Sequence, residues 1–285
     1  MIYFLTINYY STDLVSQLIK SLKSGSFSKI VIVNNSPDDE SIYLLKSESV
    51  VLLEPESNLG FGKGCNFGLN WIYERDKQAI VWIINPDAYL LPSSLKNIDL
   101  FFDSYPELSI VGTKVYTNSG IWFAGGRFIP QTGTILTVDI LTDSDTGYVP
   151  SDWVSGCSLL INLSNFCECP HFDPAYFLYY EDFDFCRRYA NLGHLIAVTK
   201  YLSVMHHPST ITNRNMFKKM QYSTFSYLLT LEKYTNNLVL LARLTRLIAY
   251  ALLLIAVKPL VAFGKLYGVL LYLRRWARLS EFPTG

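Results

Sequence analysis

The stretch MIYFLTINYYSTDLVSQLIKSLKSGSFSKIVIVNN (residues 1–35) decides the fold. Residues 1–8 and 29–33 are short runs of apolar and β-branched residues, a pattern typical of buried strands. Between them, the apolar residues of 11–23 recur at the three- and four-residue spacing of one helix face. A strand, a helix and a second strand in this order predict a β-α-β unit, whose two strands are parallel.

The alternation continues beyond this unit. Residues 50–53 predict a third strand, 58–68 are rich in Gly and Asn, 69–75 continue as a helix, and 79–84 are again an apolar strand. We therefore expect an α/β fold, with a mostly parallel sheet and helices on both faces. Ligands of such sheets bind at the carboxyl ends of the strands, where the polar turns of this sequence fall.

The rest of the chain changes character. Residues 112–150 are rich in Gly, Thr and isolated aromatics, which predicts short antiparallel strands and loops over the site. Residues 154–163 predict a strand that returns to the core, and residues 176–189 include helical spacing. Residues 217–273 are helical throughout, with a break or kink at Pro259.

These patterns divide the chain into two parts. We predict an α/β domain over residues 1–215, made of two halves, 1–112 and 113–215. A C-terminal region of amphipathic helices follows over residues 216–285, and its nature is open at this point.

Composition excludes some functions. Half of the residues are apolar and 17% are charged, so the chain can bury a large core and is not disordered. The net charge is zero, which gives no electrostatic case for nucleic acid as a partner. The five cysteines have no zinc-site spacing, and we interpret them as reduced thiols of a cytosolic protein. Residues 1–10 lack the basic segment of a secretory signal.

The C-terminal region is basic as well as apolar. From residue 243 onward it has seven basic residues and one acid, Glu281. This combination predicts contact with an anionic membrane surface. The longest uninterrupted apolar run, residues 247–257, is shorter than the roughly 20 residues that cross a bilayer. We therefore expect helices that lie on the bilayer; an ordinary helical subdomain or a dimer interface is the alternative.

Three polar groups are candidates for chemistry. Asp87 follows a strong strand in the turn Asn-Pro-Asp, where it either binds a divalent cation or caps the next helix. Glu181 and Asp182 are adjacent acids after a run of aromatics, where they act either as a catalytic base or as the acidic first turn of a helix. His206 and His207 end an apolar segment and are either a second metal ligand or a surface feature.

The order and spacing of the motifs point to a family. The motifs are Thr6-Ile7-Asn8-Tyr9, Val33-Asn34-Asn35-Ser36, the Gly-rich segment 58–68, Asn85-Pro86-Asp87, Trp153-Val154-Ser155-Gly156, Phe172-Asp173, the segment 180–188 and His206. Together they make residues 2–210 resemble the inverting glycosyltransferases of family 2, in their rhamnosyltransferase-like branch. The resemblance implies a GT-A fold, which is a Rossmann-like α/β sheet, with residues 1–112 as its nucleotide-binding half and residues 113–215 as its acceptor half.

The resemblance also assigns roles. It implies that Asp182 is the catalytic base with Glu181 before it, and that Asp87, with His206 or His207, binds Mg²⁺ or Mn²⁺ on the donor diphosphate. The residues it assigns to the donor nucleotide are Asn8, Asn34, Asn35, Asn58, Gly62, Asn66 and Asn85. The residues it assigns to the donor–acceptor cleft are Trp153, Ser155 and Gly156. The family usually has an acid at the position of Asn34.

The implied reaction moves a hexose or deoxyhexose, rhamnose included, from a nucleoside-diphosphate sugar to a glycan or lipid-linked glycan. The expected location is the cytoplasm, at the inner face of the cytoplasmic membrane. A degenerate GT-A protein that binds sugar nucleotides or glycans without activity is one alternative. A nucleotidyltransferase is another, but residues 6–12 lack the basic, Gly-rich segment of that class.

Overall fold

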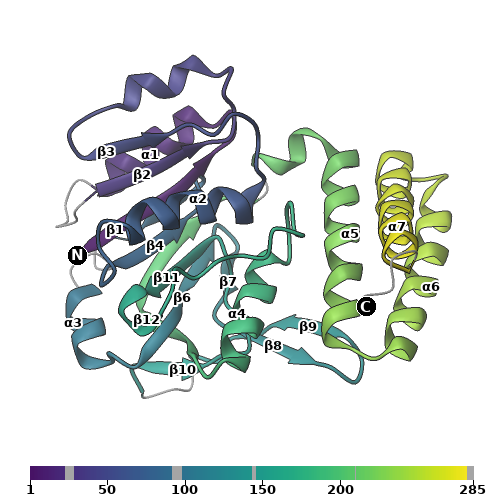
Figure 1. Ribbon diagram of the computed structural model, residues 1–285. Helices are drawn as coiled ribbons and strands as arrows, with labels where there is room; N and C mark the ends of the chain where they lie inside the picture. The colour runs from purple at the N-terminus through teal and green to yellow at the C-terminus, as the bar shows by residue number, and fades with distance from the viewer. Residues whose placement is uncertain (23–28, 92–97, 143–145, 209, 281–285) are drawn as a thin grey trace. The chain divides into compact units, whose positions relative to one another are not determined.

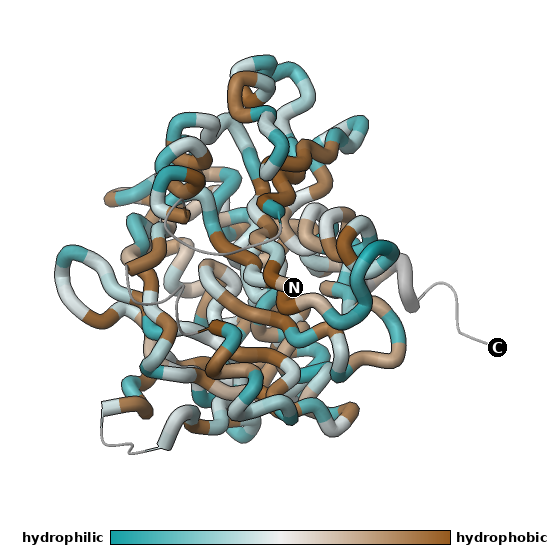
Figure 2. The backbone as a smooth tube through the Cα atoms, turned by 90° about the vertical axis from the view of Figure 1, so that its left-hand side faces the viewer, coloured by the Kyte–Doolittle hydropathy of each residue, from teal (hydrophilic) through white to brown (hydrophobic). Residues whose placement is uncertain are grey.

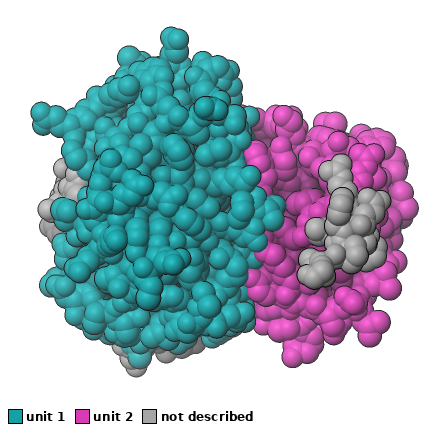
Figure 3. Space-filling view, in the orientation of Figure 1, with its two compact units in different colours: residues 1–127, 136–175, 181–211 teal, residues 128–135, 176–180, 212–285 magenta. Residues whose placement is uncertain are grey.

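A computed structural model of the chain describes residues 1–22, 29–91, 98–142, 146–208 and 210–280. The chain forms two compact units, coloured separately in Figure 3. Unit 1 comprises residues 1–127, 136–175 and 181–211, and unit 2 comprises residues 128–135, 176–180 and 212–285. Lys23, at the end of the first predicted helix, and Glu281 lie outside the described residues.

The sheet of unit 1 contains ten strands among the described residues (Figure 1). They are β1 (Ile2–Asn8), β2 (Lys29–Asn34), β3 (Val50–Leu53), β4 (Ile80–Ile84), β5 (Ala88–Leu90), β6 (Leu108–Thr117), β7 (Gly120–Phe123), β10 (Tyr148–Pro150), β11 (Ser158–Asn162) and β12 (Leu195–His206). The main order is β10-β12-β6-β11-β4-β1-β2-β3, with β5 paired to β12 and β7 paired to β6. A separate ribbon consists of β8 (Gly126–Ile129) and β9 (Thr134–Thr137).

The predicted α/β class and mostly parallel sheet are confirmed. Strands β3, β2, β1 and β4 are parallel to one another, and β6 and β12 are parallel to each other. In the main order only β11 and β10 run the other way, because each pairs antiparallel with its neighbours. The predicted boundary at residue 112 falls inside β6.

Helices cover both faces of this sheet. The helices of unit 1 are α1 (Thr12–Leu22), α2 (Phe61–Tyr73), α3 (Ile98–Ser104) and α4 (Glu181–Asn191), with 3-10 turns η1 (Glu40–Leu45) and η3 (Leu163–Asn165). The connection β1-α1-β2 moves one way across the sheet, and β3-α2-β4 moves back past β1. Right-handed crossovers in opposite directions place α1 and α2 on opposite faces.

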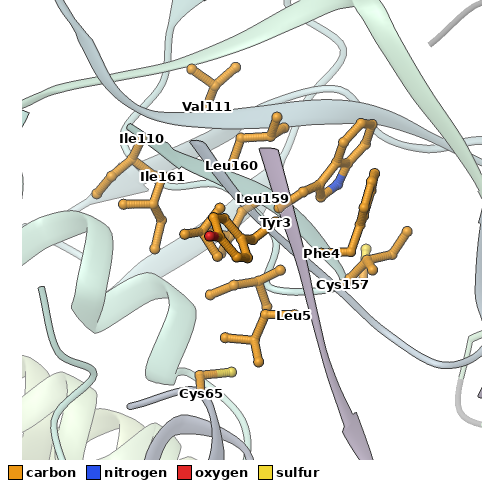
Figure 4. Packing of buried hydrophobic residues seen from close by; sticks show 14 of the residues in the cluster. Tyr3, Phe4, Leu5, Cys65, Ile110, Val111, Cys157, Leu159, Leu160 and Ile161 are labelled. Atoms are coloured by element: carbon orange, nitrogen blue, oxygen red, sulfur yellow. The ribbon is translucent and has the colours of Figure 1, made fainter. Parts of the chain in front are cut away.

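The core of unit 1 lies between the sheet and its helices. Figure 4 shows Tyr3, Leu5 and Ile161 on one face of the sheet, whereas Phe4 and Leu160 lie on the other face. The rings of Phe4 and Trp82 stack with centroids 5.4 Å apart. The brown, apolar segments of Figure 2 run through the interior of the fold, as the continuous apolar strands predict.

The Gly-rich segment corrects one expectation. We expected a helix over residues 69–75, whereas α2 already begins at Phe61 and so includes most of the Gly-rich segment 58–68. Of the glycines in the segment 58–68, only Gly60, just before the helix, has a positive φ, which is 78°. The glycines inside α2 instead allow close packing: a Cβ on Gly68 would lie 2.3 Å from Leu5 Cδ1, and one on Gly64 would lie 3.3 Å from Asn35 Nδ2. These glycines bring the helix down onto the strand ends.

Unit 2 is mainly helical. It contains η4 (Thr212–Arg214), α5 (Met216–Tyr234), α6 (Asn237–Leu254) and α7 (Pro259–Ser280). Pro259 is the first residue of α7, so the predicted break at this proline is confirmed. A small core joins the helices through Leu228, Val269 and Tyr272.

Helix α6 is unusual for a surface helix. Among the described residues it is the one helix that is long and apolar enough to cross a membrane, with 18 residues and a mean hydropathy of 1.7. Only 6% of it is buried. The sequence prediction, based on the run 247–257, underestimated this length because the helix continues through Arg243, Thr245 and Arg246.

Candidate active site

Asp182 is fixed at the start of α4. Its Oδ2 accepts a hydrogen bond from the Gly156 amide nitrogen at 2.8 Å, and its Oδ1 accepts one from the Phe183 amide at 2.8 Å. The two residues before the helix, Tyr179 and Tyr180, have φ angles of 72° and 63°, in the left-handed region. Such a conformation disfavours a non-glycine residue by about 1–2 kcal/mol. The chain is therefore strained immediately before the acids, as it often is at functional sites.

Glu181 is the more buried of the two acids. It is 6% exposed, and its Oε2 has no hydrogen-bond partner among the residues described. Gly62 of α2 faces it, since a Cβ on that glycine would lie 3.5 Å from Glu181 Cβ. Burial first, and then the nearby Asp182 carboxylate, raise the pKa of Glu181 well above its ordinary value.

Asp182 is in a more polar environment. Burial raises its pKa, but the Gly156 and Phe183 amides stabilise the carboxylate and oppose that shift. The two adjacent acids therefore differ: Asp182 has two donors for its negative form, and Glu181 Oε2 has none in the described part of the chain. Of the two acids, Asp182 is therefore the one whose negative form the backbone amides stabilise.

A third acid, Asp87, lies beside a histidine, His206. Antiparallel pairing of β5 with β12 sets Ala88 opposite His206, and the His207 amide donates to the Asp87 carbonyl at 2.9 Å. This register brings His206 Nε2 to 3.2 Å from Asp87 Oδ1, with both side chains buried. The edge of the Trp122 ring packs on His206, with ring centroids 5.2 Å apart.

His207 lies elsewhere. Successive strand residues point to opposite faces, and the His207 ring lies 5.3 Å from that of Tyr89. Of the two histidines that the sequence offered as metal ligands, the structure brings His206 Nε2 to Asp87 Oδ1, whereas the His207 ring packs beside Tyr89.

Asp87 and His206 fit a divalent cation. Although 3.2 Å apart, Asp87 Oδ1 and His206 Nε2 do not meet hydrogen-bond geometry, and neither has another partner among the described residues. Buried polar atoms are normally satisfied, so two orphaned lone-pair atoms side by side are an exception that a metal would explain. Among the described residues there is no group of three or more His, Cys, Asp or Glu side chains that could hold a metal ion. Any remaining ligands would have to come from substrate or water.

The turn Ser155–Cys157 connects Asp182 to the strand end that leads to Asp87. The Asn85 amide donates to the Cys157 carbonyl at 2.9 Å, and the neighbouring Gly156 amide donates to Asp182. Burial raises the pKa of the Cys157 thiol to about 12, with smaller contributions from the negative charges of Asp182 and Asp87. The predicted cleft residues Ser155 and Gly156 thus stand between the predicted base and the predicted metal acid.

Asn8 and Asn34 lie at the ends of β1 and β2. Both are buried, and Asn8 Nδ2 donates to Asn34 Oδ1 at 2.9 Å. Asn8 Oδ1 accepts from the Ser11 amide at 3.0 Å, and Asn34 Oδ1 accepts from the Ser36 hydroxyl at 2.9 Å. Only Asn34 Nδ2 lacks a partner within the described residues. The amides hold the two turns together, which leaves this single donor for a ligand.

Three other residues that we predicted to bind the donor nucleotide are also hydrogen-bonded within the protein. Asn35 Nδ2 donates to the Gly60 carbonyl at 2.8 Å, and Asn58 Oδ1 accepts from the Gly60 amide at 2.8 Å. Asn66 exchanges two hydrogen bonds with the Phe172 backbone, at 2.8 and 2.7 Å. These contacts position α2 against the strand ends.

Trp153 packs beside this region. Its ring lies 5.1 Å from that of Phe123, and a Cβ on Gly126 would lie 2.3 Å from Trp153 Nε1. Sequence reasoning missed two features here. Nothing in the sequence indicates the Trp122–His206 contact, because it depends on the pairing of distant strands. The left-handed Tyr179 and Tyr180 are equally invisible, since tyrosine has no preference for that conformation.

The chain is similar to several known glycosyltransferases. No family model matches the chain. The hexosyltransferase Agl10 of low-salt glycan biosynthesis from Haloferax volcanii is 21% identical over 64% of this chain and 59% of its own length. The rhamnosyltransferase WbbL of Escherichia coli is 23% identical over 80% of this chain and 92% of its own. The N-acetylglucosaminyl-diphospho-decaprenol L-rhamnosyltransferase of Mycobacterium tuberculosis is 27% identical over 59% of this chain and 62% of its own.

Solved structures show the fold. GalNAc-T7, crystallised with UDP, GalNAc and Mn²⁺, matches 81% of this chain and 47% of its own, with a TM-score of 0.60 and 11% identity. Residues 1–349 of Staphylococcus aureus TarS match 80% of this chain and 64% of that one, with a TM-score of 0.54 and 16% identity. The fold is the GT-A fold of glycosyltransferases, and the curated relatives are glycosyltransferases, rhamnosyltransferases among them. The predicted resemblance is confirmed at this level, while the chain spans about three fifths of two of those relatives.

Proposed function

We propose that this protein is an inverting, metal-dependent glycosyltransferase. It would move a hexosyl or deoxyhexosyl group, with rhamnose as one candidate, from a nucleoside-diphosphate sugar to a glycan or lipid-linked glycan. The observation that supports this best is the Asp182 carboxylate, which two backbone amides hold at the turn that also contacts the Asp87 strand end. A carboxyl group that is held in place at such an edge and accepts two backbone hydrogen bonds suits a general base.

The proposed step is a single displacement. Asp182 takes the proton of the acceptor hydroxyl while that oxygen forms a bond to the anomeric carbon. The bond from that carbon to the diphosphate oxygen breaks on the opposite side, and its electron pair leaves with the nucleoside diphosphate. Attack from the side opposite the leaving group inverts the configuration at the anomeric carbon.

Asp87 and His206 would hold the cation. The orphaned Asp87 oxygen and His206 nitrogen support a site with one hard oxygen and one imidazole ligand. A cation bound there would neutralise the negative charge that develops on the departing diphosphate. Imidazole suits transition metals better than Mg²⁺, so we infer Mn²⁺ as the preferred ion. The neighbour crystallised with UDP also contains Mn²⁺.

The donor would lie along the ends of β1 and β2. Asn34 Nδ2 is the donor group with no internal partner there, so it is the candidate for a nucleobase carbonyl. Asn8, Asn35, Asn58, Gly62, Asn66 and Asn85 would shape this edge, mostly through the internal bonds described above. Trp153 would form the wall of the cleft with Ser155 and Gly156.

The acceptor is proposed to be attached to a lipid. One relative is named for a diphospho-decaprenol acceptor, and helix α6 of this chain exposes Leu238, Leu241 and Leu253. Residues 236–280 contain no Asp or Glu, and their basic residues complement an anionic surface. Peripheral binding at the cytoplasmic face of the membrane would bring the enzyme to such an acceptor.

A transfer assay tests the proposal. Purified protein is incubated with a panel of nucleoside-diphosphate sugars, Mn²⁺ and a short-chain N-acetylglucosaminyl-diphospho-polyprenol, and released nucleoside diphosphate is measured. We expect release that needs both the acceptor and the metal, with one base preferred. If every donor binds in a thermal-shift assay but none is turned over on any glycan acceptor, the degenerate binding protein replaces this proposal.

A further inference from the structure

Unit 2 contains a small cavity of its own. Its volume is about 200 Å³. Its lining consists of Tyr180, Ser223, Thr224, Tyr227, Leu247 and Lys265. Pockets for drug-sized ligands measure roughly 300–1,000 Å³, so this cavity suits a smaller group. Four of its six lining residues have hydroxyl groups, and one has an ammonium group.

Close packing of α7 on α5 creates this cavity. A Cβ on Gly264 would lie 2.6 Å from the Phe217 carbonyl oxygen, and one on Gly268 would lie 2.6 Å from that of Gln221. Only glycine allows the two backbones to approach this closely. Lys265, next to Gly264, is thereby brought against the hydroxyl-rich stretch 223–227 of α5.

Among the described residues no acid neutralises the charge of Lys265. The side chain is half-buried, and no carboxylate of the described residues lies within 4.0 Å of its nitrogen. Its nitrogen lies 6.0 Å from the centre of the Tyr250 ring, which gives at most a weak cation–π contact. Burial lowers the pKa of Lys265, as expected for an ammonium group without a partner.

Further positive charge lies nearby. The charges of Arg243 and Arg246 lower the pKa of Tyr227, which is raised mainly by burial. Arg243 is itself bonded to neutral groups, the Thr132 carbonyl and the Thr134 hydroxyl, both at 2.7 Å. The surroundings are therefore positive, polar and short of negative charge, which favours an anion.

We propose that this cavity binds a phosphate group, with Lys265 as its cationic contact and the hydroxyls of Ser223, Thr224 and Tyr227 as further donors. The phosphate we infer is part of the diphosphate of the lipid-linked acceptor, and this identification rests on the proposed function. Tyr180, which lines the cavity, directly precedes Glu181 in the chain.

Direct binding tests the cavity without any sugar transfer. Inorganic diphosphate is titrated into the full-length protein by calorimetry, in EDTA so that no metal occupies the Asp87 site. We expect binding that weakens at least about tenfold, or about 1.4 kcal/mol, in Lys265→Gln. Lys258→Gln removes the same charge from an exposed position just before α7 and should bind as the wild type does. Thermal melting confirms that both variants fold, and Lys265→Arg should retain most of the affinity.

Two results would overturn the proposal. One is equal affinity of the wild type and Lys265→Gln for inorganic diphosphate, and the other is the absence of binding in the wild type. Vesicles with and without phosphatidylglycerol separate the sources of phosphate: dependence on Lys265 for vesicles but not for diphosphate would identify a headgroup site and contradict an acceptor site. If the protein binds diphosphate through Lys265 but transfers no sugar, the cavity stands and the proposed function fails.

Discussion

The Gly156 amide donates to Asp182 Oδ2 at 2.8 Å, across 26 residues of sequence. A Cβ on Gly156 would lie 3.2 Å from Asp182 Cβ, so the glycine also makes room for the acid. The next residue, Cys157, accepts from the Asn85 amide and so contacts the strand end that leads to Asp87. One turn therefore sets the orientation of the proposed base relative to the proposed metal acid.

Asp182→Asn should remove the base and keep its shape. We expect transfer to fall by about 100- to 10,000-fold, the usual contribution of general base catalysis, while donor binding stays within about twofold. The rate is measured by nucleoside diphosphate release and the binding by thermal shift. Glu168→Gln, which changes an exposed carboxylate, is the matched control and should keep full activity. Wild-type turnover in Asp182→Asn would remove this residue from the mechanism.

The two histidines provide a paired test of the metal site. His206→Ala should raise the Mn²⁺ concentration for half-maximal nucleoside diphosphate binding by about tenfold or more, because it removes a ligand next to Asp87. His207→Ala should leave this concentration unchanged, since that ring packs on Tyr89. The measurement is a Mn²⁺ titration followed by calorimetry. Equal titrations for wild type and His206→Ala would place the metal elsewhere.

The raised pKa of Glu181 has a consequence for stability. A carboxyl group whose pKa is higher in the folded state stabilises the fold at low pH, and this contribution is lost as the pH rises from the ordinary value of 4.5 through the folded value. In that window the free energy of unfolding should fall by up to about 1.4 kcal/mol per pH unit. Glu181→Gln should lack this loss.

Melting temperatures of wild type and Glu181→Gln between pH 4.5 and 8.5 check this expectation. The advantage of the variant should grow with pH, and the same scan of Glu168→Gln should follow the wild type. Parallel curves for wild type and Glu181→Gln would show that Glu181 ionises normally in the folded protein.

Gly68→Ala tests the packing of α2 on β1. A Cβ here would lie 2.3 Å from Leu5 Cδ1, which is closer than carbon atoms can approach. We expect a loss of about 1–3 kcal/mol in the free energy of unfolding, as for other overpacked cores. Lys63→Ala, at an exposed position of the same helix, should change stability by less than about 0.5 kcal/mol. Urea denaturation distinguishes the two, and an unchanged midpoint for Gly68→Ala would contradict the close approach.

Leu253→Glu tests membrane binding through α6. Leu253 is 77% exposed, so the substitution should leave the fold intact, while a carboxylate opposes both the apolar and the anionic parts of a bilayer. We expect vesicles with phosphatidylglycerol to pull down the wild type and several-fold less of the variant. Leu44→Glu, at an exposed leucine of η1, is the control. Release of wild type by high salt would indicate a surface position; retention in both salt and carbonate would indicate insertion.

Much of the fold follows from local pattern. The strand-helix-strand order of residues 1–35 predicts the parallel sheet, because each apolar run matches the period of one element. The polar turns at Asn34 and Asp87 predict the edge at which a ligand binds, since the carboxyl ends of parallel strands meet there. The resemblance in motif order predicts the glycosyltransferase relatives, and the comparisons confirm it.

Other features escape local pattern. The close packing at Gly62, Gly64 and Gly68 cannot be predicted from local pattern, because glycine occurs both in loops and where two backbones approach closely. The length of the apolar helix α6 was underestimated because arginines interrupt its apolar run, although arginine does not end a helix. In both cases the deciding contact, or the exposure of the helix, depends on residues that are distant in the sequence.

By itself the sequence determined the α/β class, the edge of the sheet that carries polar groups, and the acids available there. Periodicity and turn chemistry are local properties, so they can be recognised in the sequence alone. Only the tertiary structure decided that His206 and not His207 meets Asp87, that Gly156 holds Asp182, and that Lys265 faces a cavity. Each of these depends on the register of strands or on the approach of helices far apart in sequence, and that register is set by the packing of the whole core.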